Sequence, residues 1–461
     1  MKRVILVLLA AVAILFGDSV SAQLRTSYFM EGSYFRNELN PALAPTRGYL
    51  ALPVISGLGV GLNTNFLSVD NLFYQKDGQV VTALHNSVSA DEFLGKMPET
   101  AKMNINANIN VLGLGFYVKK SYWTLGLNLR TQNDVAISKD VFRALKTLGN
   151  GRYDLGNTAL GSTSFLETYL GSSFRVCDWI NIGIKAKFLV GLLNVSTEMD
   201  SMYANVAADG VTAQVRGMLR AGGFIFSSKQ AIAGQPIDEN IINTDLQYML
   251  NNLGSLGGAI DIGAEFRLLN DHLRISAAIT DLGFIHWSKK SHVAANVEAD
   301  FSYNGFNLET GEMDGDSSAE MTMVGTEQKG YTRRLNYSVN VGIEYNILNN
   351  HIAFGLLSHN EFASNNIMPE LTASVNFRPT SWISATVSHT FLGGVRPGVL
   401  GCALNIHPAG LNLFVGMDYL GLAQVKYNDI NIPRYQNSVN VYAGLGFNFG
   451  RPKALRKVKE E

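Results

Sequence analysis

The sequence predicts an all-β fold: a transmembrane outer-membrane β-barrel of about 14 antiparallel strands, with a short N-terminal plug and small loop helices. Three observations predict it. An export signal opens the chain, segments of alternating apolar and polar residues recur along it, and tight turns alternate with long loops. Together these features are typical of a chain that crosses the outer membrane of a Gram-negative cell with strands.

The first 22 residues have the pattern of a secretory signal peptide. Lys2-Arg3 precedes an apolar run over residues 4–16, and Val20-Ser21-Ala22 resembles an Ala-x-Ala cleavage site. An N-terminal membrane anchor is the alternative, but the apolar run is shorter than the ~20 residues of a spanning helix. We therefore expect cleavage before Gln23.

The composition argues against a soluble enzyme and against a nucleic-acid partner. Charged residues make up 16%, aromatic residues 10%, and the formal net charge is -1. The charged fraction is low for a soluble protein, and a neutral chain lacks the basic surface that nucleic acid requires. Cys177 and Cys402 are too few for a disulfide framework or a cysteine zinc site. After the signal peptide, the best apolar stretch, 180–195, is interrupted by Lys185 and Lys187, which excludes a helical span.

Period-two alternation is the strongest signal along the chain. Residues 336–347 place apolar side chains at odd positions and polar or small ones at even positions, and 180–188, 260–268 and 383–388 repeat the pattern. The polar faces extend over ~10 residues with few charges, which favours a barrel lumen over the solvent face of a soluble sandwich. We expect strands near residues 49–65, 104–118, 121–134, 163–176, 179–199, 257–269, 272–287, 335–348, 351–360, 370–378, 382–391, 399–407, 411–419 and 439–449.

Loop lengths alternate between these strands. The long connections include 66–103, 135–162, 200–256 and 288–334. Short turns on one side and long loops on the other predict that the tight turns and both termini are periplasmic. The tight turns are Lys119-Lys120, Cys177-Asp178, Asn270-Asp271, Asn349-Asn350, Pro379-Thr380-Ser381 and Pro408-Ala409-Gly410.

Aromatic residues near the predicted strand ends indicate two interfacial girdles. Trp123, Trp179 and Trp382 follow tight turns, whereas Trp287 and Tyr419 lie near the opposite rim. Tryptophan and tyrosine are enriched at both membrane interfaces of such barrels.

The long loops contain segments with helical periodicity. We expect helices within 91–102, 138–148 and 238–253, which would cap the extracellular mouth or fold into it. Residues 203–226 could instead add a hairpin, which would raise the strand count to about sixteen.

A short motif precedes the first strand. Within Ser33–Pro45, the tripeptide Asn40-Pro41-Ala42 resembles the Asn-Pro-Ala hatch motif of the long-chain fatty-acid transporter (FadL-like) family. The resemblance implies a 14-stranded barrel whose lumen is plugged by this segment, with a path for an apolar ligand. Asp281–Trp287 resembles a group of functionally uncharacterised outer-membrane barrels related to that family. Without the resemblance, the tripeptide is a helix start or a periplasmic turn.

The expected organisation follows from these segments. A signal peptide covers 1–22, an N-terminal plug segment 23–48, the β-barrel 49–449 and a periplasmic C-terminal tail 450–461.

Motifs for catalysis, cofactors or metals are not found. The eight histidines lack metal-ligand spacing, and neither a Gly-x-Ser-x-Gly elbow nor a phosphate loop occurs. The acidic stretch from Glu309 to Glu320 could attract calcium, but it lacks the spacing of a calcium loop and fits a solvated loop better. We expect no enzyme and no catalytic, cofactor or metal site.

Two functions remain. The first is a plugged channel for apolar small molecules such as fatty acids. The second is a non-transporting structural or partner-docking barrel, for example a secretion-system accessory. In either case we expect a monomer in the outer membrane that contacts lipid and either a hydrophobic ligand or a protein partner, and no nucleic acid.

Overall fold

The computed structural model describes residues 25–450, apart from 54–56, 77–78, 148–150, 208–209, 228–231, 238–241, 244, 305–316, 328, 364–365, 393–398, 422–423, 428–429 and 434–437. The predicted signal peptide and most of the predicted C-terminal tail therefore lie outside the described residues.

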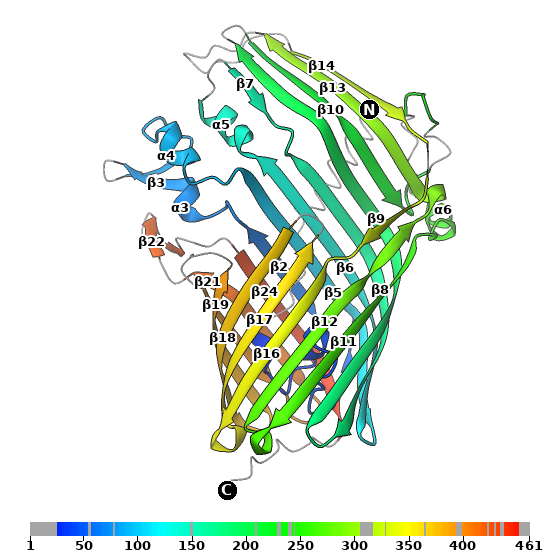
Figure 1. Cartoon of the computed structure of the whole chain (residues 1–461), viewed down its shortest axis with the longest axis vertical. Helices are drawn as coiled ribbons and strands as arrows, with labels where there is room; N and C mark the ends of the chain where they lie inside the picture. Colours follow the sequence, from blue (N-terminus) through cyan, green and yellow to red (C-terminus); the bar gives the residue numbers. More distant parts are fainter. Residues whose placement is uncertain are drawn as a thin grey trace.

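One antiparallel sheet closes on itself as a 14-stranded barrel, as predicted (Figure 1). Its first strand is split into β1 and β2, and both parts pair with β5 on one side and with the last strand, β24, on the other. The wall strands are, in chain order, β1 (Gly48–Ala51) with β2 (Leu58–Thr64), β5 (Thr100–Val118), β6 (Ser121–Ser138), β8 (Ala159–Cys177), β9 (Ile180–Ala207), β11 (Leu256–Leu268), β12 (Leu273–Trp287), β15 (Tyr331–Arg334) with β16 (Tyr337–Ile347), β17 (Ile352–Ala363), β18 (Asn366–Thr380), β19 (Ile383–Leu392), β20 (Val399–Ile406), β21 (Asn412–Gly421) and β24 (Ser438–Phe449).

The six predicted tight turns all connect consecutive wall strands and gather at one end of the barrel, the lower end in Figure 1. Asn270 and Asn349 adopt positive φ values of 57° and 53° in two of these turns. Asparagine tolerates this left-handed conformation because its short side chain can hydrogen-bond to the local backbone. The asparagines that predicted these two turns in the sequence therefore occupy the left-handed positions at which the chain reverses direction.

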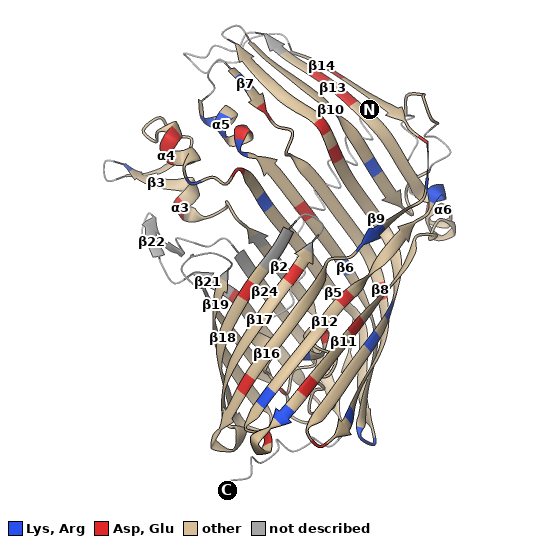
Figure 2. Cartoon of the chain, in the orientation of Figure 1, with Lys and Arg blue, Asp and Glu red and all other residues tan. Residues whose placement is uncertain are grey.

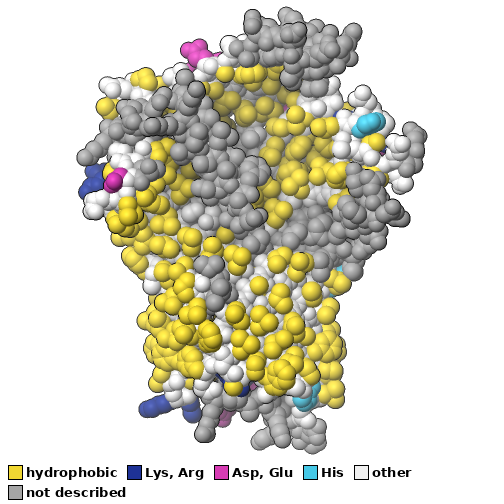
Figure 3. Space-filling model, turned by 180° about the vertical axis from the view of Figure 1, so that it is seen from behind, with side chains coloured by type: hydrophobic (Ala, Val, Ile, Leu, Met, Phe, Trp, Pro, Cys, Tyr) yellow, Lys and Arg dark blue, Asp and Glu magenta, His cyan; other side chains and the backbone are white. Residues whose placement is uncertain are grey.

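The two faces of the wall strands differ in polarity. In β16, Val341 and Ile343 are 42% and 43% exposed on the outside, whereas Asn340 is 0% exposed inside. On the face seen in Figure 3, apolar side chains cover most of the lower part of the outer surface, and Trp179 and Trp382 are exposed at the tight-turn end of the barrel. No helix among the described residues is long and apolar enough to cross a membrane. This closed wall with an apolar exterior makes the protein an outer-membrane β-barrel.

A bulge in β12 overturns one predicted girdle position. Pairing of β11 with β12 shifts between Ile260 and Ile262, and Asp281 on the bulged strand has a φ of 63°. An extra residue reverses the inward and outward alternation beyond it. Trp287 consequently faces inward and is 0% exposed, so it does not contact lipid. The side chain of Tyr419 lies outside the described part of the chain.

A tall sheet rises above the barrel at the long-loop end (Figure 1). The first half of β9 pairs with β11, and its second half, from Leu193, pairs with β10 (Gly210–Gly223). Beyond β10 lie β13 (His292–Asn304) and β14 (Ser317–Gly325), and β7 (Gly151–Asp154) pairs on the other side of β9. The hairpin considered for residues 203–226 thus exists, formed by the end of β9 and β10, but it extends this sheet and does not raise the wall to sixteen strands.

Short helices lie near the long-loop end, and two of them are shorter than predicted. They are α3 (Val69–Leu72), α4 (Ala90–Leu94), α5 (Lys139–Thr147) and α6 (Leu246–Asn251). The helix predicted over 91–102 ends at Leu94 because Gly95 and Pro98 follow, and β5 already begins at Thr100. Two hairpins, β3 (Phe73–Lys76) with β4 (Gln79–Thr82) and β22 (Gln424–Tyr427) with β23 (Ile430–Pro433), complete this end.

Candidate functional site

The N-terminal segment, Arg25–Arg47, lies inside the lower half of the barrel (Figure 1). It contains a short 3-10 helix, Arg25–Ser27, and one helical turn, α2 (Arg36–Leu39). Wall side chains donate hydrogen bonds to its backbone carbonyls: Lys185 to Asn37 at 3.1 Å, Asn340 to Leu39 at 2.8 Å and Ser173 to Ala42 at 3.1 Å. Irregular backbone at membrane depth requires such partners.

Asn40, Pro41 and Ala42 form a compact turn at the end of α2. Asn40 is 0% exposed, and its side-chain oxygen accepts a hydrogen bond from the Ala42 amide at 2.9 Å. Its side-chain nitrogen donates to the Tyr28 hydroxyl at 3.1 Å and to the Ala277 carbonyl on β12 at 3.4 Å. The Asn40 amide therefore satisfies the turn and joins it to the wall, while Pro41 has no amide hydrogen that would need a partner.

Two paired wall glycines make room for this turn. Gly183 on β9 and Gly263 on β11 are register partners. A Cβ at Gly183 would lie 2.1 Å from the Pro41 carbonyl carbon, and a Cβ at Gly263 would lie 2.1 Å from the Asn40 side-chain oxygen. Neither position can carry a side chain while the turn occupies this place, which explains why both residues are glycine.

The beginning of the segment is held in the same manner. A Cβ at Gly342 would lie 2.6 Å from the Tyr28 ring, and a Cβ at Gly355 would lie 2.5 Å from the Phe29 ring. Arg378 of β18, 1% exposed, donates a hydrogen bond of 2.6 Å to the Phe29 carbonyl. Ring packing and a buried cation thus anchor the start of the segment to the wall.

A layer of buried charges crosses the lumen above the segment. Arg130 makes a bidentate contact with Asp281, at 2.7 and 2.9 Å, and contacts Glu167 at 2.7 Å. Lys187 contacts Asp281 at 2.5 Å and Asp261 at 2.8 Å. These charges come from β6, β8, β9, β11 and β12 and are buried; Figure 2 shows charged residues on these strands. Each of these charges has an opposite partner, so none of them is buried without compensation, and together they fill the lumen with polar groups.

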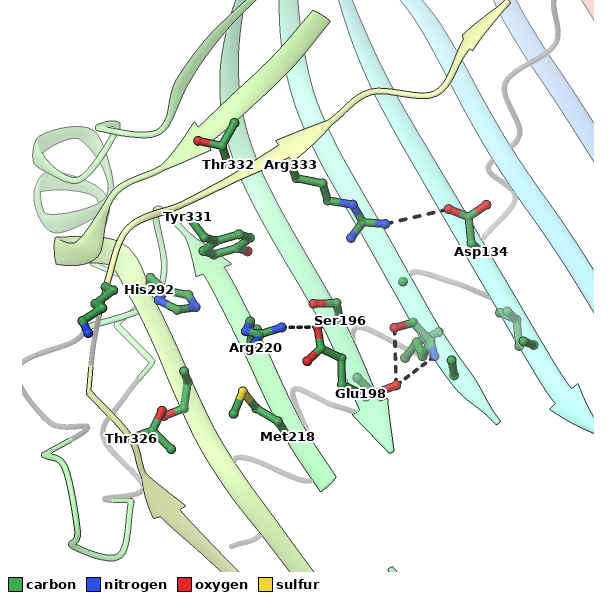
Figure 4. A pocket seen from close by; sticks show the side chains of 18 of the residues that line it. Asp134, Ser196, Glu198, Met218, Arg220, His292, Thr326, Tyr331, Thr332 and Arg333 are labelled. Carbon is green, nitrogen blue, oxygen red and sulfur yellow. Dashed lines mark hydrogen bonds and ion pairs between the residues drawn. The ribbon is translucent and has the colours of Figure 1, made fainter. Parts of the chain in front are cut away.

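A cavity of about 710 Å³ lies above this layer, between the tall sheet and the strand β15 that crosses it (Figure 4). Its volume lies within the usual range for small-molecule sites. The lining combines small apolar residues with both signs of charge, including the ion pairs Arg220–Glu198 and Arg333–Asp134. The cavity therefore fits a molecule with apolar and hydrogen-bonding parts better than a bare hydrocarbon.

His292 lines this cavity at the start of β13. It is 3% exposed, and its ring lies 4.6 Å from the Tyr331 ring. Burial lowers the pKa of His292 to about 4, so its ring is uncharged at neutral pH. An uncharged imidazole can donate and accept hydrogen bonds, which suits it to a polar group of a ligand.

The described residues contain no group of three or more histidine, cysteine, aspartate or glutamate side chains that could hold a metal ion. The acidic residues from Glu309 to Asp316, considered above as a calcium loop, lie outside the described residues.

The sequence singled out Asn40, Pro41 and Ala42 by their resemblance to a hatch motif, but it did not indicate the wall residues against which they lie. Gly183 and Gly263 stand at polar or small positions of the alternating segments 180–188 and 260–268, which does not distinguish them from other lumen-facing residues. The sequence feature that could have revealed them is glycine at a lumen-facing position in the middle of a strand, which often marks the close approach of another backbone. The charged layer was missed because Arg130 and Asp281 are 151 residues apart in the chain.

The family comparison covers most of the chain. A family model described as "Family of unknown function (DUF5723)" matches residues 41–418. The chain belongs to this family. The match begins inside the Asn40-Pro41-Ala42 turn and includes the charged layer and the large cavity of this DUF5723 protein. A search of the curated proteins finds no match.

Several solved outer-membrane channels resemble this DUF5723 protein in structure. The toluene transporter TbuX of Ralstonia pickettii is 7% identical, with 96% of this chain and 100% of that chain covered and a TM-score of 0.42. The toluene transporter TodX of Pseudomonas putida is 8% identical, with 94% and 95% covered and a TM-score of 0.39. A FadL homologue of Pseudomonas aeruginosa is 8% identical, with 94% and 98% covered and a TM-score of 0.34. Because these TM-scores are below 0.5, the fold assignment rests on the strand pairing described above.

Proposed function

We propose that this DUF5723 protein is a plugged outer-membrane channel in which residues 23–48 close the lumen. Small molecules with apolar and polar parts, of which fatty acids are one class, enter from the large cavity above the charged layer. The observation that carries the proposal is the close packing of the Asn40-Pro41 turn against the paired wall glycines Gly183 and Gly263. Glycine weakens a strand but allows another backbone to approach closely. Two paired glycines beneath the turn are therefore expected if the N-terminal segment has a function inside the barrel.

Deletion of Ser33–Pro45, with the signal peptide retained, tests the plug. We expect a folded, heat-modifiable barrel with a higher single-channel conductance in planar bilayers, because the segment no longer fills the lower lumen. Uptake of a fluorescent fatty acid by cells that carry the variant should change as well. A matched deletion of the β3–β4 hairpin, Phe73–Thr82, removes an extracellular element outside the wall and should leave conductance unchanged.

A second function is favoured by one specific observation. Beside Asn40 the lumen is filled by polar contacts, and the charged layer lies between it and the large cavity. This filling suits a barrel that docks a partner on its tall extracellular sheet and transports nothing. Unchanged conductance and unchanged fatty-acid uptake in a normally folded deletion variant would reject the channel and leave the docking barrel.

A further inference from the structure

A second cavity, of about 100 Å³, lies at the tight-turn end of the lumen between the N-terminal segment and the wall. It has room for several water molecules, or for one small polyatomic ion. Basic side chains dominate its lining, and Figure 2 shows lysines and arginines at this end of the barrel. The five basic residues are Arg36, Lys120, Arg175, Arg267 and Arg274.

Among the described residues, two acidic side chains line the cavity, and both already have partners. Glu31 is paired with Arg274, and Glu265 accepts from Arg267 at 2.6 Å. Arg36, Lys120 and Arg175 make no ion pair within 4 Å with any described residue. The cavity therefore holds a surplus of positive charge.

Arg36 is the decisive member of this set. It is 4% exposed, yet its guanidinium makes no hydrogen bond with a described residue, and its Nε atom is buried without a partner. Glu31 and Glu265 attract it at longer range, but each is bound to another arginine. A buried cation without a close partner is costly, which indicates that a group outside the chain completes its coordination.

The wall supplies the facing cations. Arg175 lies near the end of β8 and Lys120 in the turn before β6. The charge of Arg267 repels that of Arg175, and the carboxylates of Asp178 and Asp271 attract it without an ion pair within 4 Å. Repulsion of this kind is relieved by an anion between the two groups. Arginine matches oxyanions well, because its planar guanidinium can donate two parallel hydrogen bonds to two oxygens.

We propose that this cavity binds a phosphate group, which joins Arg36 of the N-terminal segment to Arg175 and Lys120 of the wall. The phosphate is inorganic phosphate or the terminal phosphate of a larger periplasmic molecule. Because its ligands come from both the segment and the wall, the anion holds the segment in place. Phosphate binding goes beyond the proposed channel function and does not depend on it.

Thermal unfolding of the purified full-length protein in detergent tests the proposal. Inorganic phosphate is titrated at constant ionic strength, with sodium chloride as the balancing salt, so that general screening is held constant. We expect a saturable rise in the unfolding temperature, because a ligand that binds only the folded state stabilises it. Glycerol 3-phosphate forms a second arm: a similar rise supports a terminal phosphate, and a rise with inorganic phosphate alone supports an enclosed site for the free ion.

Arg36→Gln and Arg175→Gln should each weaken the apparent phosphate affinity at least about tenfold, the loss expected for one charge-assisted contact. Arg216→Gln is the control, since Arg216 lies on the tall sheet and pairs with Asp300 at 2.8 Å. If Arg36→Gln fails to fold, the partly exposed Arg175 carries the comparison. The proposal is overturned if phosphate raises the unfolding temperature of the wild type no more than chloride does. It is also overturned if phosphate raises the unfolding temperature of both pocket variants as much as that of the wild type. Because the readout is stability and not conductance, failure of the phosphate site and failure of the channel are separately visible.

Discussion

At the scale of single residues, glycine decides where the N-terminal segment can lie. On β11, a Cβ at Gly263 would lie 2.1 Å from the Asn40 side-chain oxygen, whereas a Cβ at Gly258 would meet nothing closer than 3.6 Å. We expect Gly263→Ala to lower the free energy of unfolding by about 1–3 kcal/mol, the usual cost of overpacking. Gly258→Ala on the same strand is the matched control and should change stability by less than about 1 kcal/mol. Urea unfolding in detergent measures the free energy of unfolding of both variants. Equal losses would show that the wall beside Asn40 tolerates a side chain at position 263.

At the scale of elements, the alternation of a wall strand assigns one face to lipid. Ile262 lies at the centre of β11 and is 49% exposed on the outside. We expect Ile262→Arg to lower barrel stability by about 2–4 kcal/mol, because an arginine at the bilayer midplane loses hydration. Leu246→Arg is the control, since Leu246 is 67% exposed on α6 outside the wall. Unfolding in lipid vesicles compares the two, and similar small losses would place Ile262 outside the membrane.

At the scale of the whole molecule, the tight turns and the long loops lie at opposite ends, and we expect the turns to be periplasmic. The background for the test replaces the native Cys177 and Cys402 by serine. Arg143→Cys on α5 should then react with an impermeant maleimide on intact cells, whereas Ser381→Cys should react only after the outer membrane is permeabilised. If only Ser381→Cys were labelled on intact cells, the barrel would have the opposite orientation, with the tight turns outside.

Sequence alone predicted the wall strands, the tight turns and a barrel of about 14 strands, with sixteen left open. Period-two alternation and turn residues such as Asn270 act over a few neighbouring positions, so they can be read without knowing the partners. The tripeptide Asn40-Pro41-Ala42 was singled out in a different way, by its resemblance to a hatch motif. The tertiary structure decided the rest, because register and closure depend on strands that are far apart in the chain. One extra residue at Asp281 turned Trp287 from lipid to lumen.

The contents of the lumen also belong to the tertiary structure. Arg130 meets Asp281 across 151 residues, and Arg36 meets the wall near Arg175 only because the barrel closes around its own N-terminal segment. No local pattern encodes such a meeting, since each strand presents the same alternation whichever strand stands opposite. Local physics therefore set what each strand and turn is, and closure of the barrel set which of their side chains share one cavity.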